Sequence, residues 1–305
     1  MSIISKSLKK NLFHITDECM MGYLFALLTA ISTGLYVTLS KLALNFLSPL
    51  DFICFVMVLS VLFLLPFLPF ESKIRPISRK ALFFLLLHSG CAVFGTWAFW
   101  TGLKEMNPAA ASFINRTETL VTILLAVVIL KERLSWWLLI ATAVVVCGLT
   151  VMSLPSLGSF QKPQAGFWLV VASSFGWGMA EVFSKIAIQY FTPLRFTFWR
   201  NVLVTIPFVV VAMARSSVPM PEGNVLAIVA AASFLGPVMA RMFYMQALKR
   251  MDVSLASIFG QTQPIFTAFF ALLILHSWPR PNEWVGGFLI VFGCTLLVSW
   301  RNHSM

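Results

Sequence analysis

The stretch that decides the fold is PAAASFINRTETLVTILLAVVIL, residues 108–130, which is apolar at both ends and polar in its middle. At its centre stand Asn115, Arg116 and Glu118, with threonines beside them. The run has the length of about 20 residues that a helix needs to cross a membrane. Ionisable side chains inside such a helix are costly, and they face the protein interior or a water-filled cavity. The stretch therefore predicts a membrane-spanning helix with a functional polar site at mid-depth.

The whole chain has the composition of a membrane protein. Of its 305 residues 59% are hydrophobic and 11% are charged, whereas about a quarter of an average soluble domain is charged. The net charge of +11 comes from basic residues in short connections between apolar runs. This pattern is typical of loops beside a membrane, so no nucleic-acid partner is expected. The five cysteines form no CxxC pair, and neither a metal site nor a cofactor is predicted.

Apolar runs of spanning length recur along the chain and predict an all-α membrane protein with ten transmembrane helices. The predicted spans are residues 21–42, 50–70, 80–103, 108–130, 135–154, 166–190, 194–214, 224–247, 253–276 and 283–300. Residues 1–20 are predicted to be a cytoplasmic tail or a short interfacial helix. Residues 155–165 are predicted to be an extracytoplasmic linker, and residues 301–305 a second cytoplasmic tail.

The distribution of Lys and Arg predicts the orientation. If the N-terminus is cytoplasmic, the inner segments hold Lys6, Lys9, Lys10, Lys73, Arg75, Arg79, Lys80, Lys131, Arg133, Lys249, Arg250 and Arg301. The outer segments then hold only Lys104, Lys162, Arg215 and Arg280. Basic residues favour the cytoplasmic side. We therefore predict that both termini are cytoplasmic and that the protein lies in a bacterial inner membrane.

The two halves of the chain align with each other at a nearly constant offset. At an offset of 144, residues 40–43 (SKLA) match residues 184–187 (SKIA), and at an offset of 145, Thr117 matches Thr262. Each half has five predicted spans, an odd number, so the second half enters the membrane inverted. We predict two inverted five-helix repeats, residues 21–154 and 166–300, which is typical of transporters with a substrate site near the midplane.

This arrangement resembles the EamA-type transporters of the drug/metabolite transporter superfamily, over residues 22–300. The residues that carry the resemblance are Pro264, Trp284, Gly286, Gly287 and Gly293 in the second half, and Lys131, Glu132, Arg133, Trp136, Trp137 and Gly148 in the first. Two positions depart from the family pattern. Thr119 stands where a first-half proline is expected, and Ser277 where a second-half acid is expected. The resemblance implies a monomer or homodimer in which spans 108–130 and 253–276 line a central cavity.

Helical spacing and the repeat together suggest the substrate-binding residues. Asn115 and Glu118 are three residues apart and share a helix face, whereas Arg116 and Glu118 are two apart and are predicted to be poor partners for each other. The aligned residues of the second half are Gln261 and Gln263. We expect these side chains to form a polar ring at mid-depth, with Arg116 in it or just behind it. The alternative is a buried clamp, in which an arginine of a neighbouring span neutralises Glu118.

A second group of candidates lies in the span at 166–190. Trp177, Glu181 and Lys185 are spaced four residues apart and share one face. They form either an aromatic wall with a charged gate below it or a self-neutralised Glu–Lys pair.

Other spans supply single candidates. The charged ends of the substrate are expected to meet Glu118 and either Arg116 or Arg241. The aromatic residues expected to hold its apolar body are Tyr36, Trp97, Trp177 and Tyr244. The alternative for Trp97 is an interfacial position at the membrane surface. Arg195 and Arg200, near the start of the span at 194–214, are predicted to extend to the cytoplasmic interface.

The predicted function is secondary transport of a small polar metabolite, such as an amino acid or a related amphoteric compound, by alternating access. Glu118 is the candidate for proton coupling, and exchange is the other possible driving force. The sequence contains no GxxxxGK[ST] motif, the pattern that would indicate ATP binding. A flippase of a lipid or lipid-linked precursor is the alternative. A membrane-bound enzyme is a remote alternative, because the short loops carry no paired carboxylates or metal-spaced His/Asp set, and no enzymatic activity is expected.

Overall fold

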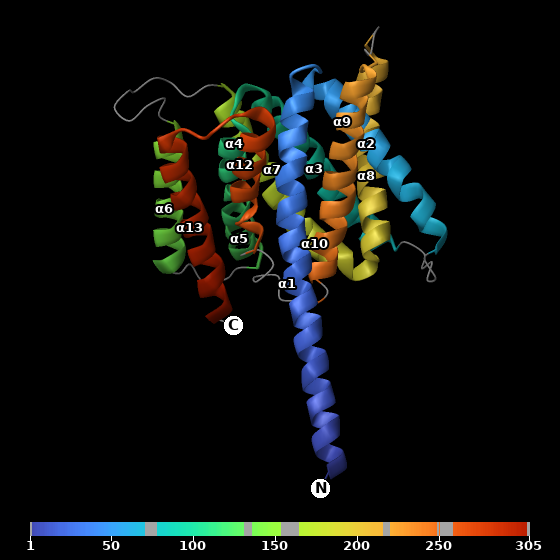
Figure 1. Ribbon diagram of the computed structural model, residues 1–305, viewed down its shortest axis with the longest axis vertical. Helices are drawn as coiled ribbons and strands as arrows, with labels where there is room; N and C mark the ends of the chain where they lie inside the picture. Colours follow the sequence, from blue (N-terminus) through green and yellow to red (C-terminus); the bar gives the residue numbers. More distant parts are fainter. Residues whose placement is uncertain are drawn as a thin grey trace.

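The computed structural model describes residues 2–70, 78–130, 136–153, 165–215, 220–248, 250 and 259–303, and the elements it assigns there are helices. In chain order they are α1 (Ser2–Leu44), α2 (Pro49–Leu64), η1 (Leu65–Phe70), α3 (Arg79–Glu105), α4 (Pro108–Asn115), α5 (Thr117–Leu130), α6 (Trp136–Ser153), α7 (Ala165–Ala187), η2 (Ile188–Tyr190), α8 (Pro193–Met213), α9 (Gly223–Ser233), η3 (Phe234–Ala240), α10 (Arg241–Leu248), α12 (Gln263–Leu275) and α13 (Pro281–His303). They form one bundle (Figure 1). The prediction of an all-α membrane protein is confirmed.

Six helical stretches of the described chain are long and apolar enough to cross a membrane. They are Met20–Leu44, Pro49–Pro69, Arg79–Glu105, Ala165–Tyr190, Pro193–Met213 and Gly223–Ala247. Ile140–Met152 and Gln263–Leu275 are shorter apolar helices. The count of ten spans stays a prediction, and part of the predicted span at 253–276 lies outside the described residues.

Three helices begin with the same local signal, a capping side chain followed by proline. Ser48, Asn107 and Thr192 are the caps, and their side-chain oxygens accept bonds from backbone N–H groups of the first turn. Each cap satisfies donors that a helix start leaves free, and the proline that follows has no N–H to satisfy. This pairing explains why α2, α4 and α8 start where they do.

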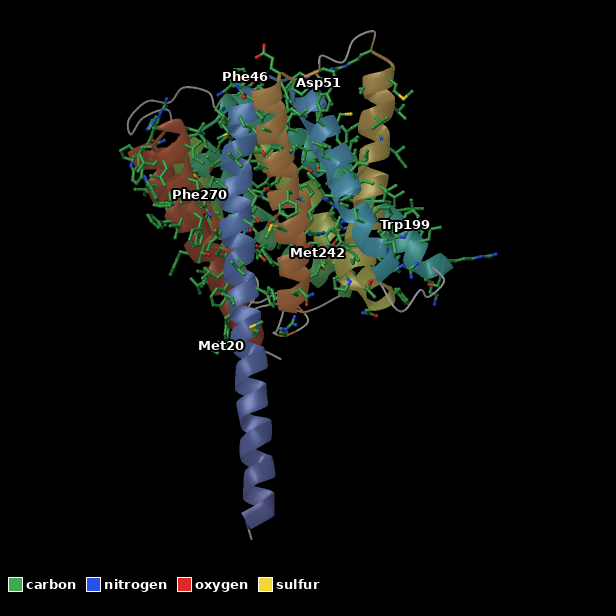
Figure 2. All side chains as sticks on the ribbon, turned by 45° about the vertical axis from the view of Figure 1, so that its right-hand side comes forward. Met20, Phe46, Asp51, Trp199, Met242 and Phe270 are labelled. Carbon is green, nitrogen blue, oxygen red and sulfur yellow. The ribbon has the colours of Figure 1, made fainter. Side chains whose placement is uncertain are left out.

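The first helix, α1, is continuous from Ser2 to Leu44. Its N-terminal part, predicted as a tail or an interfacial helix, projects from the bundle, and the C-terminus of α13 lies at the same end (Figure 1). The turn between α1 and α2 lies at the opposite end, where Phe46 and Asp51 are found (Figure 2).

Each half of the chain packs against the other. Within the described residues α3 packs along α7, α6 along α13, and α2 along α8, while α1 contacts α9, η3, α10 and α12. Gly102 of α3 faces α7 so closely that a Cβ atom there would lie 2.6 Å from the carbonyl oxygen of Gly166. Gly148 of α6 meets Gly286 of α13 in the same way, at 2.7 Å. Small residues allow such close backbone approach between membrane helices.

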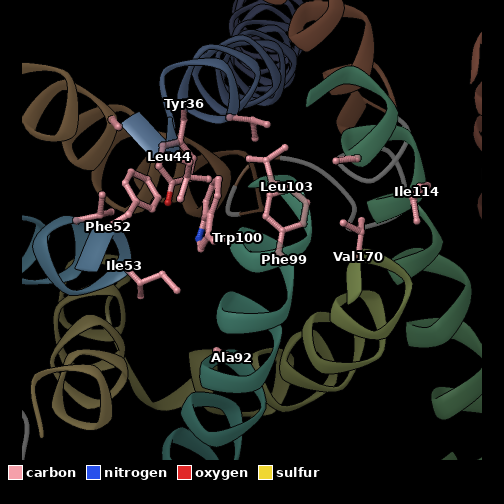
Figure 3. Packing of buried hydrophobic residues seen from close by; sticks show 14 of the residues in the cluster. Tyr36, Leu44, Phe52, Ile53, Ala92, Phe99, Trp100, Leu103, Ile114 and Val170 are labelled. Atoms are coloured by element: carbon pink, nitrogen blue, oxygen red, sulfur yellow. The ribbon is translucent and has the colours of Figure 1, made fainter. Parts of the chain in front are cut away.

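An aromatic cluster fills the space between α1, α2 and α3. The rings of Tyr36 and Trp100 lie 5.0 Å apart, and the Phe52 and Phe99 rings also pack edge-on against Trp100 (Figure 3). Such edge-to-face pairs stabilise beyond their buried area. Tyr36 of this cluster also interacts electrostatically with Arg200 of α8.

Candidate functional site

The predicted helix at 108–130 is broken at its centre. α4 ends at Asn115 and α5 begins at Thr117, so that Arg116 occupies the junction. The second half is interrupted by a turn at Gln261 and Thr262, directly before α12. Arg116 and Gln261 are the residues that the internal alignment pairs. Discontinuous helices of this kind supply free backbone groups at binding sites inside membranes.

The two breaks contact each other. Arg116 Nη1 donates to the carbonyl oxygen of Gly260 at 3.1 Å, and Gln261 Nε2 donates to Thr119 Oγ1 at 3.0 Å. The thiol of Cys294 donates to the carbonyl oxygen of Arg116 at 3.3 Å. Side chains thus bind backbone carbonyls at both interruptions, which lowers the cost of irregular backbone in an apolar bundle. Thr119, which departs from the family pattern, serves as an acceptor here.

The structure corrects one prediction about Arg116 and Glu118. Arg116 Nη2 lies 3.3 Å from Glu118 Oε1, so that the two form an ion pair instead of pointing apart. The prediction assumed an unbroken helix, and the break at Arg116 removes the helical spacing on which it rested. Neither side chain needed an oppositely charged residue on a neighbouring span.

The local charges suit the ends of the two half-helices. Glu118 lies in the first turn of α5, where free N–H groups favour a negative charge. Arg116 caps the C-terminal end of α4, where free carbonyl groups favour a positive charge. Asn115 Nδ2 adds a longer bond of 3.4 Å to Glu118 Oε2. The sequence Asn-Arg-Thr-Glu therefore fits a helix break.

Several groups at the breaks have no protein partner. Asn115 Oδ1, Arg116 Nε and Gln261 Oε1 are buried without hydrogen-bond partners among the described residues. Gln263 is 4% exposed. Asn115, Arg116, Glu118 and Gln261 are thus brought together.

A second polar cluster lies on α7 and α10. The hydroxyl of Tyr244 donates to Glu181 Oε1 at 3.0 Å. Glu118 interacts electrostatically with both Glu181 and Arg241, so this cluster adjoins the helix breaks. The side chain of Lys185 lies outside the described residues, and the predicted Glu181–Lys185 pair stays a prediction.

The prediction for Arg200 is wrong. Arg200 is 3% exposed, and its guanidinium lies 5.8 Å from the centre of the Trp177 ring instead of reaching the interface. Its Nη1 donates to Asn201 Oδ1 at 2.9 Å. A basic residue near a helix end points inward or outward according to the face that packs, and hydropathy does not report this. The neighbouring Asn201 in an otherwise apolar run was the signal for a buried polar site.

The predicted aromatic residues separate into two groups. Tyr36 and Trp177 are both associated with Arg200. Tyr36 interacts with it electrostatically, and the ring of Trp177 lies beside its guanidinium. Trp97 is 38% exposed, and the ring packed against it is that of Phe94. Trp97 therefore lies apart from the polar clusters.

Metal binding finds no support in the described ranges, where no three His, Cys, Asp or Glu side chains are grouped to hold an ion. What the structure does gather is a set of charged and amide side chains inside an apolar helical bundle, the arrangement of a polytopic membrane transporter. The sequence model of the EamA-like transporter family matches residues 20–154 and again residues 164–299. The chain belongs to this family, within the drug/metabolite transporter superfamily, and the resemblance predicted from the sequence is confirmed.

Individual relatives are distant. The chain is 24% identical to the S-adenosylmethionine uptake transporter of Rickettsia prowazekii over 285 residues, which cover 93% of this chain and 94% of that one. It is 28% identical over 195 residues to a probable amino-acid metabolite efflux pump of Salmonella typhimurium, covering 61% of this chain and 62% of the pump. A protein of known crystal structure superposes with a TM-score of 0.65 over 94% of this chain and 98% of its own, at 15% identity, a similarity of fold alone.

Proposed function

We propose that the protein is a secondary active transporter that moves a small amphoteric metabolite across a bacterial inner membrane by alternating access. The observation that carries the proposal is the contact between two helix breaks, through Arg116 and Gly260, inside an apolar bundle. Charged side chains of both signs lie beside it. Acidic groups can hold an amine, and basic groups can hold a carboxylate.

The names of the relatives support this substrate class. One is described as an uptake transporter of S-adenosylmethionine and another as a probable amino-acid metabolite efflux pump. Compounds of both kinds carry amine and carboxylate groups. The direction of transport differs between these two relatives and is not assigned for this chain.

We infer that the chain forms ten spans in two inverted repeats, residues 21–154 and 166–300. The double match of the family supports this division. The packing supports it as well, because α3 lies along α7 just as the helix α9–η3–α10 lies along α1. These two pairs exchange under the internal alignment. Ten spans place both termini on one side, which we propose is the cytoplasm.

The proposed substrate ring consists of Asn115, Arg116, Glu118, Gln261 and Gln263, with unpartnered polar atoms in three of these side chains.

Aromatic and charged side chains extend the site on the cytoplasmic side. Tyr36, Trp177 and Tyr244 would hold the apolar body of the substrate, and Arg241 its acidic end. Glu181, bonded to Tyr244, is the proposed gate. Glu118 is the proposed proton carrier, and exchange of one metabolite for another is the other driving force.

The test is a binding screen on the purified protein, followed by transport. The melting temperature is recorded against amino acids, S-adenosylmethionine, nucleosides and quaternary amines, since a ligand of the folded state raises it with concentration. Any active compound is then followed into proteoliposomes with a pH gradient of either sign. We expect an amphoteric compound to bind and its uptake to be lost in Glu118→Gln. Binding restricted to nucleosides or quaternary amines would overturn the proposed substrate class.

A further inference from the structure

Two arginines lie in the cytoplasmic half of the bundle, Arg200 buried and Arg241 half-buried. Arg200 comes seven residues after the start of α8, about 10 Å along its axis. Arg241 is the first residue of α10. The two interact electrostatically. Each guanidinium lies near an aromatic ring, Arg200 5.8 Å from the Trp177 ring centre and Arg241 6.0 Å from the Phe196 ring centre. Such cation–π contacts stabilise a cation but do not neutralise its charge.

The positive charge of this pair is not balanced by contact with an acid. In the part of the chain that the structure describes, neither guanidinium has a carboxylate within ion-pair distance, unlike the guanidinium of Arg116. The hydrogen bond of Arg200 goes to the neutral amide of Asn201. An uncompensated charge buried in an apolar interior costs several kcal/mol. The two like charges also repel each other. Arg241 is attracted by Glu118, and an anion bound between the two guanidinium groups would stabilise both.

Both arginines, and the indole ring near Arg200, carry free hydrogen-bond donors. Among the described residues, Nε of Arg200, Nε of Arg241 and Nε1 of Trp177 are buried without partners. All three atoms can only donate. Their common complement is an acceptor with several lone pairs, and a carboxylate meets a guanidinium in the planar geometry that both favour.

Neighbouring elements hold the two arginines in place. Asn201 accepts from Arg200 and donates to Ser60 Oγ at 3.1 Å and to the carbonyl oxygen of Pro237 at 3.3 Å. Pro237 belongs to η3, a π-helix that ends directly before Arg241. π-Helices are rare and are frequently found at functional sites. Asn201 therefore links the backbone that carries Arg241 to the side chain of Arg200.

We propose that Arg200 and Arg241, beside the ring of Trp177, form an anion subsite that binds the carboxylate of the transported metabolite. Glu118 interacts electrostatically with both Glu181 and Arg241, and we assign the amine of the metabolite to these two carboxylates. The substrate is then a zwitterion that binds with its acidic end at the arginine pair. This inference rests on the proposed function and names the group by which the substrate is recognised.

The test compares three forms of three probes on the full-length protein in detergent. The probes are L-methionine, L-phenylalanine and S-adenosylmethionine. Each is compared with an analogue that lacks the carboxylate and with an analogue that lacks the amine. Melting temperatures give apparent affinities for the wild type, Arg200→Gln, Arg241→Gln and the control Arg195→Gln, which removes the same charge from the same helix. We expect the carboxylate-bearing forms to bind at least about 30-fold more weakly to the two subsite variants, and as well as before to the control.

The outcomes separate the two proposals. Two results would overturn the anion subsite and leave the transporter proposal standing. One is decarboxylated amines that bind the wild type as tightly as the parent compounds do, and the other is acids that bind Arg200→Gln and Arg241→Gln as tightly as the wild type. A wild type that binds no form of any probe would overturn the amphoteric substrate class and the subsite with it. If a Gln variant does not fold, the Lys variant keeps the charge without the planar fork. The Lys variant should also bind the acids more weakly than the wild type does. Binding as tight as that of the wild type would overturn the subsite.

Discussion

The ion pair at the helix break is the most direct quantity to measure. Arg116 Nη2 and Glu118 Oε1 are 3.3 Å apart, and their side chains are 11% and 25% exposed. At an effective dielectric constant of about 20, two unit charges at that distance attract by about 5 kcal/mol. Partial exposure of Glu118 reduces this value, and a coupling energy of about 2 kcal/mol is expected for a contacting pair.

The perturbation is a double-mutant cycle of Arg116→Gln, Glu118→Gln and the double variant. Arg116→Gln leaves Glu118 with the 3.4 Å bond from Asn115, and Glu118→Gln leaves Arg116 bonded to Gly260 without a counter-ion. Each single variant should lose about 2 kcal/mol of stability. Because the coupling is about as large, the double variant should lose no more than either single one.

The assay is thermal unfolding of detergent-purified protein followed by tryptophan fluorescence. About 2 kcal/mol corresponds to a melting temperature lower by about 4–8 °C for chains of 150–250 residues, and less for a longer chain. Losses that simply add in the double variant would show that the two side chains do not interact, and the account of the break given above would then be wrong.

Three further predictions address other contacts. Tyr244→Phe removes the donor to Glu181 and should lower stability by about 1.5–3 kcal/mol, whereas Tyr190→Phe, at an exposed ring, should not; equal melting curves would exclude the bond. Gly102→Ala places a Cβ 2.6 Å from an α7 carbonyl oxygen and should destabilise by about 1–3 kcal/mol, whereas Gly90→Ala meets nothing within 4 Å; similar effects of both would refute the close crossing. A C-terminal green fluorescent protein fusion should fluoresce and an alkaline phosphatase fusion should be inactive, and the reverse result would place the C-terminus outside.

Hydropathy alone predicted the class of fold. Backbone polar groups in lipid must bond to each other, as they do in a helix, and a helix that crosses the membrane needs about 20 apolar residues. It also located the polar centre at Asn115, Arg116 and Glu118, since charges are rare at such depth. The break at Arg116 was missed because apolar runs continue on both sides of it. The spacing rules then gave a wrong orientation for the arginine.

The inward orientation of Arg200 was missed for a different reason. A cationic residue one or two turns inside a span can extend to the interface or turn inward, and both are compatible with the same sequence. Only the packing of α8 against α2 and of Trp177 beside the guanidinium decides between them. A position relative to several helices is a property of the tertiary arrangement, which one sequence does not report.

The π-helix η3, Phe234–Ala240, sets the rotational phase of everything that follows it in its helix. A π turn holds one more residue than an α turn, and each residue of an α-helix turns by about 100° about the axis. If the same residues closed as a regular α-helix, the extra residue would turn Arg241 and Tyr244 by about 100°, away from Arg200 and Glu181. The site thus depends on a count of residues as well as on their identities. Comparisons with relatives therefore require that insertions be placed correctly at η3, because a shift of one position would assign the wrong side chains to the arginine pair.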